Sequence, residues 1–137
     1  ILLFGALDML DGALARVTGQ STTFGAFLDS TLDRFSEAAL LLGLLIYYVQ
    51  SDVWYATLAV VLCYLTAVGS LMVSYTRARA EGLQLGAEVG WLQRPERIIA
   101  LGLGLIFGLA LPTLAALAVL THVTTVQRII HVWRATR

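Results

Sequence analysis

The residues from Val53 to Tyr75 read VWYATLAVVLCYLTAVGSLMVSY and include no charged side chain. A helix needs about 20 apolar residues to cross the hydrocarbon core of a bilayer, because each residue advances it by about 1.5 Å. We therefore predict a transmembrane helix here. The whole chain agrees with a membrane environment, since 58% of its 137 residues are hydrophobic and 13% are charged.

Three further apolar segments flank this stretch. Ile1 to Leu14 has the character of the second half of a span, Phe35 to Val49 follows it, and Ile98 to Val126 comes last with Pro112 inside it. Because proline breaks helices, we expect the last segment to form two short spans that turn at Pro112. The sequence thus predicts an all-α, polytopic transmembrane helix bundle with about five spans, in one domain that covers residues 1–137.

The charges predict how the chain is oriented in the membrane. The net charge is zero, which gives no indication of a nucleic-acid partner. If the chain reverses after Val49, again between residues 77 and 97, and again at Pro112, every basic residue falls on one side. By the positive-inside rule that side is cytoplasmic in a cell membrane. The basic residues are all arginines: Arg16, Arg34, Arg77, Arg79, Arg94, Arg97, Arg128, Arg134 and Arg137.

Two short segments carry most of the acidic residues that matter for chemistry. They read DMLDGALAR from Asp8 to Arg16 and, eight residues later, GAFLDSTLD from Gly25 to Asp33. At about 100° per residue, the aspartates of each segment lie on one face of a helix. The intervening hydroxyl and glycine residues allow the chain to turn, so we expect the two faces to meet.

Four carboxylates at a membrane boundary require a physical explanation. An aspartate near the centre of a membrane helix costs about 2.5 to 3.5 kcal/mol on insertion scales, and mutual repulsion adds to that cost. Divalent cations such as Mg²⁺ or Mn²⁺ prefer carboxylate and phosphate oxygens and would offset both. The alternative is that the aspartates pair with Arg16 and Arg34 or are solvated at helix ends.

These segments resemble the signature of the CDP-alcohol phosphatidyltransferase family, Asp-x₂-Asp-Gly-x₂-Ala-Arg-x₈-Gly-x₃-Asp-x₃-Asp, here from Asp8 to Asp33. The resemblance implies a membrane enzyme of six spans that transfers a phosphatidyl group from CDP-diacylglycerol to an alcohol. Compared with that layout, we expect this chain to be truncated at its N-terminus. The first span and the start of the second would be missing.

The resemblance also implies roles for individual residues. It makes Asp8, Asp11, Asp29 and Asp33 the ligands of two Mg²⁺ or Mn²⁺ ions, and Asp33 also the base that takes the proton of the acceptor hydroxyl. The positions that contact the CDP part of the donor lipid are Gly12, Arg16 and Thr22.

Within the family, the chain looks like the branch that makes phosphatidylinositol phosphate. A second polar region supplies side chains suited to an acceptor that carries its own phosphate, because arginine forms charge-assisted, bidentate hydrogen bonds with phosphate. The best candidates are Arg79, either Arg94 or Arg97, and Arg128, with Ser74 and Arg77 behind them. The alternative is that these arginines only determine topology and meet lipid head groups.

Other functions remain open at this point. Phosphatidylglycerophosphate synthesis also uses a phosphate monoester, and an ether-lipid donor would leave the same polar residues. In a different class, intramembrane aspartates can mark the path of a divalent-cation transporter. A homodimer is one further alternative, because Gly104 and Gly108 form a Gly-x-x-x-Gly pair that permits close helix contact, although such a pair also arises by chance in a glycine-rich helix.

Overall fold

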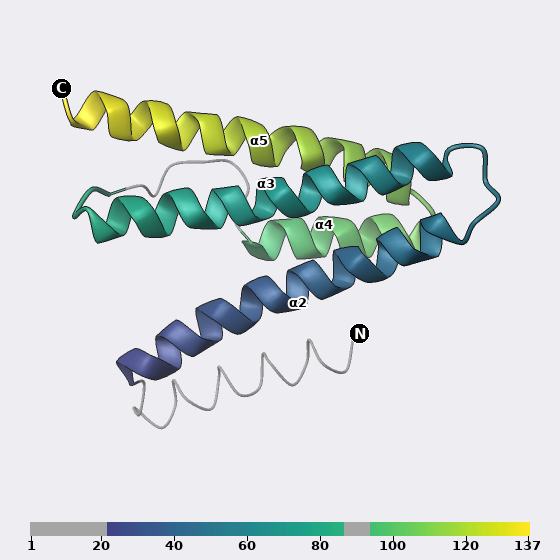
Figure 1. Cartoon of the computed structure of the whole chain (residues 1–137), viewed down its shortest axis with the longest axis horizontal. Coiled ribbons are helices and arrows are strands. Elements are labelled where there is room, and N and C mark those ends of the chain that lie inside the picture. Colours follow the sequence, from purple (N-terminus) through teal and green to yellow (C-terminus); the bar gives the residue numbers. More distant parts are fainter. Residues whose placement is uncertain (1–21, 87–93) are drawn as a thin grey trace. The chain divides into compact units, whose positions relative to one another are not determined.

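The computed structural model describes residues 22–86 and 94–137, and within them the regular structure is entirely α-helical (Figure 1). The helices are α2 (Thr23–Val49), α3 (Ala56–Gly82), α4 (Arg94–Ile106) and α5 (Ala110–Ala135). The chain divides into two compact units, residues 1–40 and residues 41–137. Helix α2 begins in the first unit, and α3, α4 and α5 belong to the second.

The start of α2 is stabilised by a side-chain cap. The hydroxyl of Thr22 accepts a hydrogen bond from the backbone N–H of Gly25, with 3.0 Å between nitrogen and oxygen. This bond satisfies one of the N–H groups that the first turn of any helix leaves without a partner. A Cβ at Gly25 would lie 3.1 Å from the same hydroxyl, so glycine allows the close approach. The cap therefore fixes where the helix that carries Asp29 and Asp33 begins.

Helices α3 and α5 pack closely along much of their length (Figure 1). Gly69 of α3 and Thr121 of α5 lie at the tightest contact, where a Cβ on Gly69 would come within 2.8 Å of the Cβ of Thr121. The hydroxyl of Thr66 also donates to the carbonyl of Leu114 across the interface, at 3.2 Å. Small residues and hydroxyl groups at a helix contact are typical of packing inside a bilayer.

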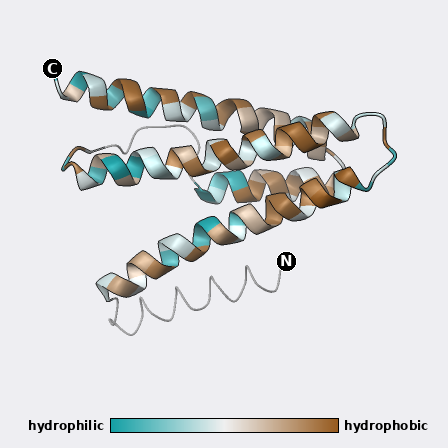
Figure 2. Ribbon diagram, viewed as in Figure 1, coloured by the Kyte–Doolittle hydropathy of each residue, from teal (hydrophilic) through white to brown (hydrophobic). Residues whose placement is uncertain are grey.

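Hydropathy along the helices agrees with a membrane protein. Both α3 and α5 are long and apolar enough to cross a bilayer. Figure 2 shows hydrophobic residues in their central parts and hydrophilic residues toward the C-terminal end of α3 and the N-terminal end of α4. The prediction of an all-α membrane fold is thus confirmed, and the span predicted from Val53 to Tyr75 corresponds to α3, which continues to Gly82.

The last apolar segment forms two helices, as predicted, but the expected turn at Pro112 is wrong. The chain turns between Ile106 and Ala110, where Gly108 has a φ of +70° that a side chain would disfavour. Pro112 is the third residue of α5, a position at which no backbone N–H is needed for the helix. Helix α4 has 13 residues and is about 20 Å long, shorter than a full span.

Both glycines of the Gly104–Gly108 pair have roles inside the chain. Gly104 is buried against α5, where an added Cβ would lie 2.8 Å from the Cβ of Thr113. Gly108 provides the positive φ of the turn. The pair therefore serves the packing of α4 on α5, and it gives no support to the homodimer for which its spacing was considered.

The contact at Gly69 generates a test of the fold. We expect Gly69→Ala to lower the thermal unfolding temperature of the purified protein by several degrees, because overpacking costs about 1 to 3 kcal/mol. Gly43→Ala is the matched control, since a Cβ at Gly43 would meet nothing within 4 Å. Equal unfolding temperatures for the two variants would contradict the close approach of α3 to α5.

Candidate functional site

The described part of the acidic motif lies on α2. Asp29 and Asp33 are four residues apart and therefore share one face of the helix. Asp29 is exposed, whereas Asp33 is half-buried. Two carboxylates one turn apart provide oxygen ligands of the kind that a hard divalent cation prefers.

Arg34 modifies the surroundings of Asp33. One terminal nitrogen of Arg34 lies 3.9 Å from a carboxylate oxygen of Asp33 and donates a 2.6 Å hydrogen bond to the carbonyl of Ser30. At 3.9 Å the two charges attract each other without a hydrogen bond between these atoms. The alternative interpretation of the sequence, in which the aspartates pair with neighbouring arginines, is thus supported at Asp33 by one weak ion pair.

The other residues of the motif, Asp8, Asp11, Gly12 and Arg16, lie outside the described residues. Over residues 22–86 and 94–137, no group of three or more histidine, cysteine, aspartate or glutamate side chains could hold a metal ion. Asp29 and Asp33 are therefore the two predicted ligands whose positions are known. Thr22, predicted to contact the CDP group, is the residue that caps α2.

Three of the predicted acceptor-binding arginines come from three different helices. We call Arg77 of α3, Arg97 of α4 and Arg128 of α5 the arginine cluster. Arg97 and Arg128 are only 3% and 4% exposed. Arg128 lies close enough to Arg77 and Arg97 to interact with their charges, and it donates a hydrogen bond to the carbonyl of Val73 on α3.

The remaining acceptor candidates lie on the same helices in different environments. Ser74 follows Val73 on α3 and is half-buried, and Arg79 is exposed. Arg94 is the first residue of α4 and is half-buried. Since sequence alone left Arg94 and Arg97 as equivalent candidates, burial and the interaction with Arg128 favour Arg97.

Sequence reasoning assigned no role to Glu81, which lies beside the arginine cluster. Its carboxylate accepts a hydrogen bond from Nε of Arg77 at 2.7 Å, and its charge also interacts with Arg128. Glu81 received no role because the predicted acceptor site was defined by cationic and hydroxyl side chains that suit phosphate. The spacing of four residues between Arg77 and Glu81, typical of helical ion pairs, was the signal that could have identified it.

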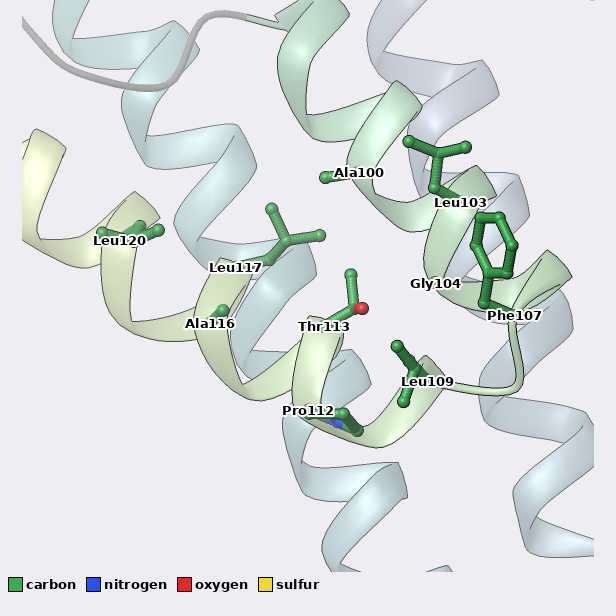
Figure 3. A pocket seen from close by; sticks show the side chains of 10 residues that line it. All are labelled: Ala100, Leu103, Gly104, Phe107, Leu109, Pro112, Thr113, Ala116, Leu117 and Leu120. Atoms are coloured by element: carbon green, nitrogen blue, oxygen red, sulfur yellow. The ribbon is translucent and has the colours of Figure 1, made fainter.

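An apolar groove of about 490 Å³ lies between α4 and α5 near the turn that joins them (Figure 3). Its walls include Leu103, Phe107, Leu109 and Leu117, with the hydroxyl of Thr113 among them. The lining contains no charged side chain, and it is formed by the ends of α4 and α5 that lie away from Arg97 and Arg128. The groove therefore cannot supply the charges that phosphate chemistry requires.

Comparison with known families and proteins gives a consistent result. The model of the CDP-alcohol phosphatidyltransferase family matches residues 1–135. The archaetidylinositol phosphate synthase of Pyrococcus horikoshii is 42% identical over 132 residues, which are 94% of this chain and 65% of the relative. The phosphatidylinositol phosphate synthase of Mycobacteroides abscessus is 41% identical over 135 residues, or 93% of this chain and 60% of the relative. The chain thus spans less than two thirds of the length of these relatives.

Solved structures of phosphatidylinositol phosphate synthase from Mycobacterium tuberculosis are also similar. The structure with CDP-DAG bound has a TM-score of 0.83 and 36% identity, and the match covers 97% of this chain and 70% of that one. The complex with manganese and citrate has a TM-score of 0.85 and 37% identity, with 97% and 67% covered. The sequence motif, the helical membrane fold and these matches agree, and the chain belongs to the CDP-alcohol phosphatidyltransferase family.

Proposed function

We propose that the protein transfers a phosphatidyl group from CDP-diacylglycerol to a hydroxyl group of a phosphorylated polyol and releases CMP, with inositol phosphate as the acceptor. The observation that carries this proposal is the convergence of Arg77, Arg97 and Arg128 from three helices. Similar proteins named as phosphatidylinositol phosphate or archaetidylinositol phosphate synthases support the choice of acceptor.

The arginine cluster suits an acceptor that carries a phosphate group. Burying a guanidinium group costs free energy, and each anion or hydrogen-bond acceptor beside it reduces that cost. A phosphate monoester accepts several charge-assisted hydrogen bonds and would offset that cost. In the proposed site, Arg77, Arg97 and Arg128 bind the acceptor phosphate, and Ser74, Arg79 and Arg94 lie around it.

The proposed metal site consists of Asp8, Asp11, Asp29 and Asp33. Carboxylate oxygens alone form a donor set suited to Mg²⁺ or Mn²⁺, and a similar solved structure is a complex with manganese. Two such ions, when bound, would neutralise the charge of the donor pyrophosphate and of the departing CMP. The exposed carboxylate of Asp29 is accessible to a metal without rearrangement of α2.

Asp33 has a second role in the proposed mechanism, because the acceptor hydroxyl must lose a proton as it attacks phosphorus. A half-buried carboxylate at the end of the acidic face is suited to take that proton. Gly12, Arg16 and Thr22 contact the CDP part of the donor. The hydrogen bond between Thr22 and Gly25 fixes the side chain of Thr22 at the start of α2.

We further propose that the protein crosses the membrane several times and that its active site faces the cytoplasm. The arginine cluster lies toward the C-terminal ends of α3 and α5 and the N-terminal end of α4. Helices α3 and α5 run in the same direction and α4 runs in the opposite direction, which brings these ends together (Figure 1). An excess of arginine on one side is typical of the cytoplasmic face.

Two alternatives remain within the proposed chemistry. Glycerol 3-phosphate is also a phosphate monoester and would satisfy the same arginines. An ether-lipid donor is the second alternative, since one similar protein is named as an archaetidylinositol phosphate synthase. A divalent-cation transporter, the candidate from another class, is disfavoured by membership of a transferase family.

The proposal is tested by measuring release of CMP from CDP-diacylglycerol by the full-length protein. The assay contains Mg²⁺ or Mn²⁺ and, in separate reactions, inositol phosphate, glycerol 3-phosphate, or unphosphorylated inositol. We expect the fastest release with inositol phosphate and little with inositol. Metal transport in proteoliposomes without release of CMP would overturn the enzyme proposal.

Substitution of the aspartates should separate metal binding from proton transfer. We expect Asp33→Asn to lower kcat by about 100-fold or more, because a general base contributes about that much, while it weakens metal binding less. Asp8→Asn and Asp29→Asn should mainly weaken metal binding, measured by calorimetry with Mn²⁺. An equal loss of metal affinity in all three variants would contradict a separate role for Asp33.

Arg128→Ala should raise the KM for inositol phosphate by about 10- to 100-fold, because a charge-assisted hydrogen bond to phosphate is lost. The KM for CDP-diacylglycerol should change little, which also reports that the variant is folded. Arg134→Ala is the control, since Arg134 is an exposed arginine further along the same helix. An unchanged acceptor KM in Arg128→Ala would remove Arg128 from the proposed site.

A further inference from the structure

The carboxylate of Glu81 interacts with the arginine cluster. It belongs to the last turn of α3 and lies one helical turn after Arg77. Its oxygen is 2.7 Å from Nε of Arg77, and its charge attracts Arg128 on α5. Glu81 therefore acts electrostatically on two of the three cationic groups of the arginine cluster.

The ion pair itself contributes little to the stability of the fold. The side chains of Arg77 and Glu81 are 42% and 51% exposed, and exposed pairs four residues apart on a helix are weak. The effect of the Glu81 charge on a bound dianion is larger. A phosphate monoester carries nearly two negative charges. The Glu81 carboxylate repels each of these charges, and the two repulsive energies add.

We propose that Glu81 is an internal counter-ion that limits how tightly the arginine cluster holds a phosphate monoester. This inference rests on the proposed acceptor site. The phosphate of the acceptor does not react, so it is also present on the head group of the product. Without the charge of Glu81, the arginine cluster would bind the phosphate group of both molecules more tightly. Glu81 thus sets an affinity that permits binding of the acceptor and release of the product.

Removal of the Glu81 carboxylate would change phosphate affinity in opposite directions in the two possible roles, as a counter-ion or as a group that only positions Arg77. If the carboxylate served to orient the guanidinium, its removal would weaken phosphate binding. If it serves as a counter-ion, its removal strengthens phosphate binding. Glutamine retains the size of the side chain and a carbonyl oxygen that can accept the Nε hydrogen bond, while it removes the charge. Glu81→Gln therefore isolates the contribution of charge.

The test measures the KM of the full-length protein for inositol phosphate. In Glu81→Gln we expect that KM to fall by about 3- to 10-fold at physiological salt, because a like charge within about one screening length is removed. The KM for CDP-diacylglycerol should stay unchanged. The control is Asp52→Asn, which makes the same change of charge in the loop before the opposite end of α3. An unchanged or higher acceptor KM in Glu81→Gln would overturn the inference.

Measuring the binding of inorganic phosphate tests the counter-ion role of Glu81 independently of the proposed reaction. Calorimetry with wild-type protein and Glu81→Gln, without donor lipid, should show tighter phosphate binding to the variant and no change in Asp52→Asn. If that result is obtained while no acceptor supports release of CMP, the counter-ion role stands and the proposed reaction fails. If CMP is released but Glu81→Gln binds phosphate no more tightly, the reaction stands and the counter-ion role fails.

Discussion

The close contact between α3 and α5 is the constraint on which the arginine cluster depends. At Gly69 the backbone of α3 comes so near to Thr121 that a single added methyl group would clash with the Cβ atom of the threonine. This approach brings the C-terminal part of α5 against α3, where Arg128 donates a hydrogen bond to the carbonyl of Val73. Without it, Arg77 and Arg128 would belong to separate surfaces of separate helices.

Several buried polar groups inside the second unit are satisfied in one of two ways. The hydroxyls of Thr121 and Thr125 donate to carbonyl groups one turn earlier in their own helix, at 2.8 and 3.0 Å. Such bonds let threonine lie in an apolar interface without an unpaired donor. Thr66 and Arg128 instead donate across the interface. The few bonds between helices therefore determine how α3 and α5 align, because losing one would leave a buried polar group without a partner.

Much of the fold and part of the candidate site could be predicted from the sequence. Helix α3 is a long apolar run, and its existence follows from the cost of placing charge in a bilayer, although the helix continues beyond the predicted end at Tyr75. The position of the last turn was missed because Pro112 was treated as a helix breaker. In the structure, Gly108 makes the turn and Pro112 occupies the first turn of α5, where proline is tolerated. Local sequence allowed both arrangements.

The sequence by itself determined the helical membrane character, the family and the shared face of Asp29 and Asp33, because these properties depend on composition, on fixed spacing and on the period of one helix. Only the tertiary structure brings Arg77 and Arg97 near Arg128 and places Glu81 beside Arg77. Arg77, Arg97 and Arg128 are separated by 20 and 31 positions along the chain, so no helical period relates them. Their proximity arises from the packing of α5 against α3 and α4, which depends on the absence of side chains at Gly69 and Gly104.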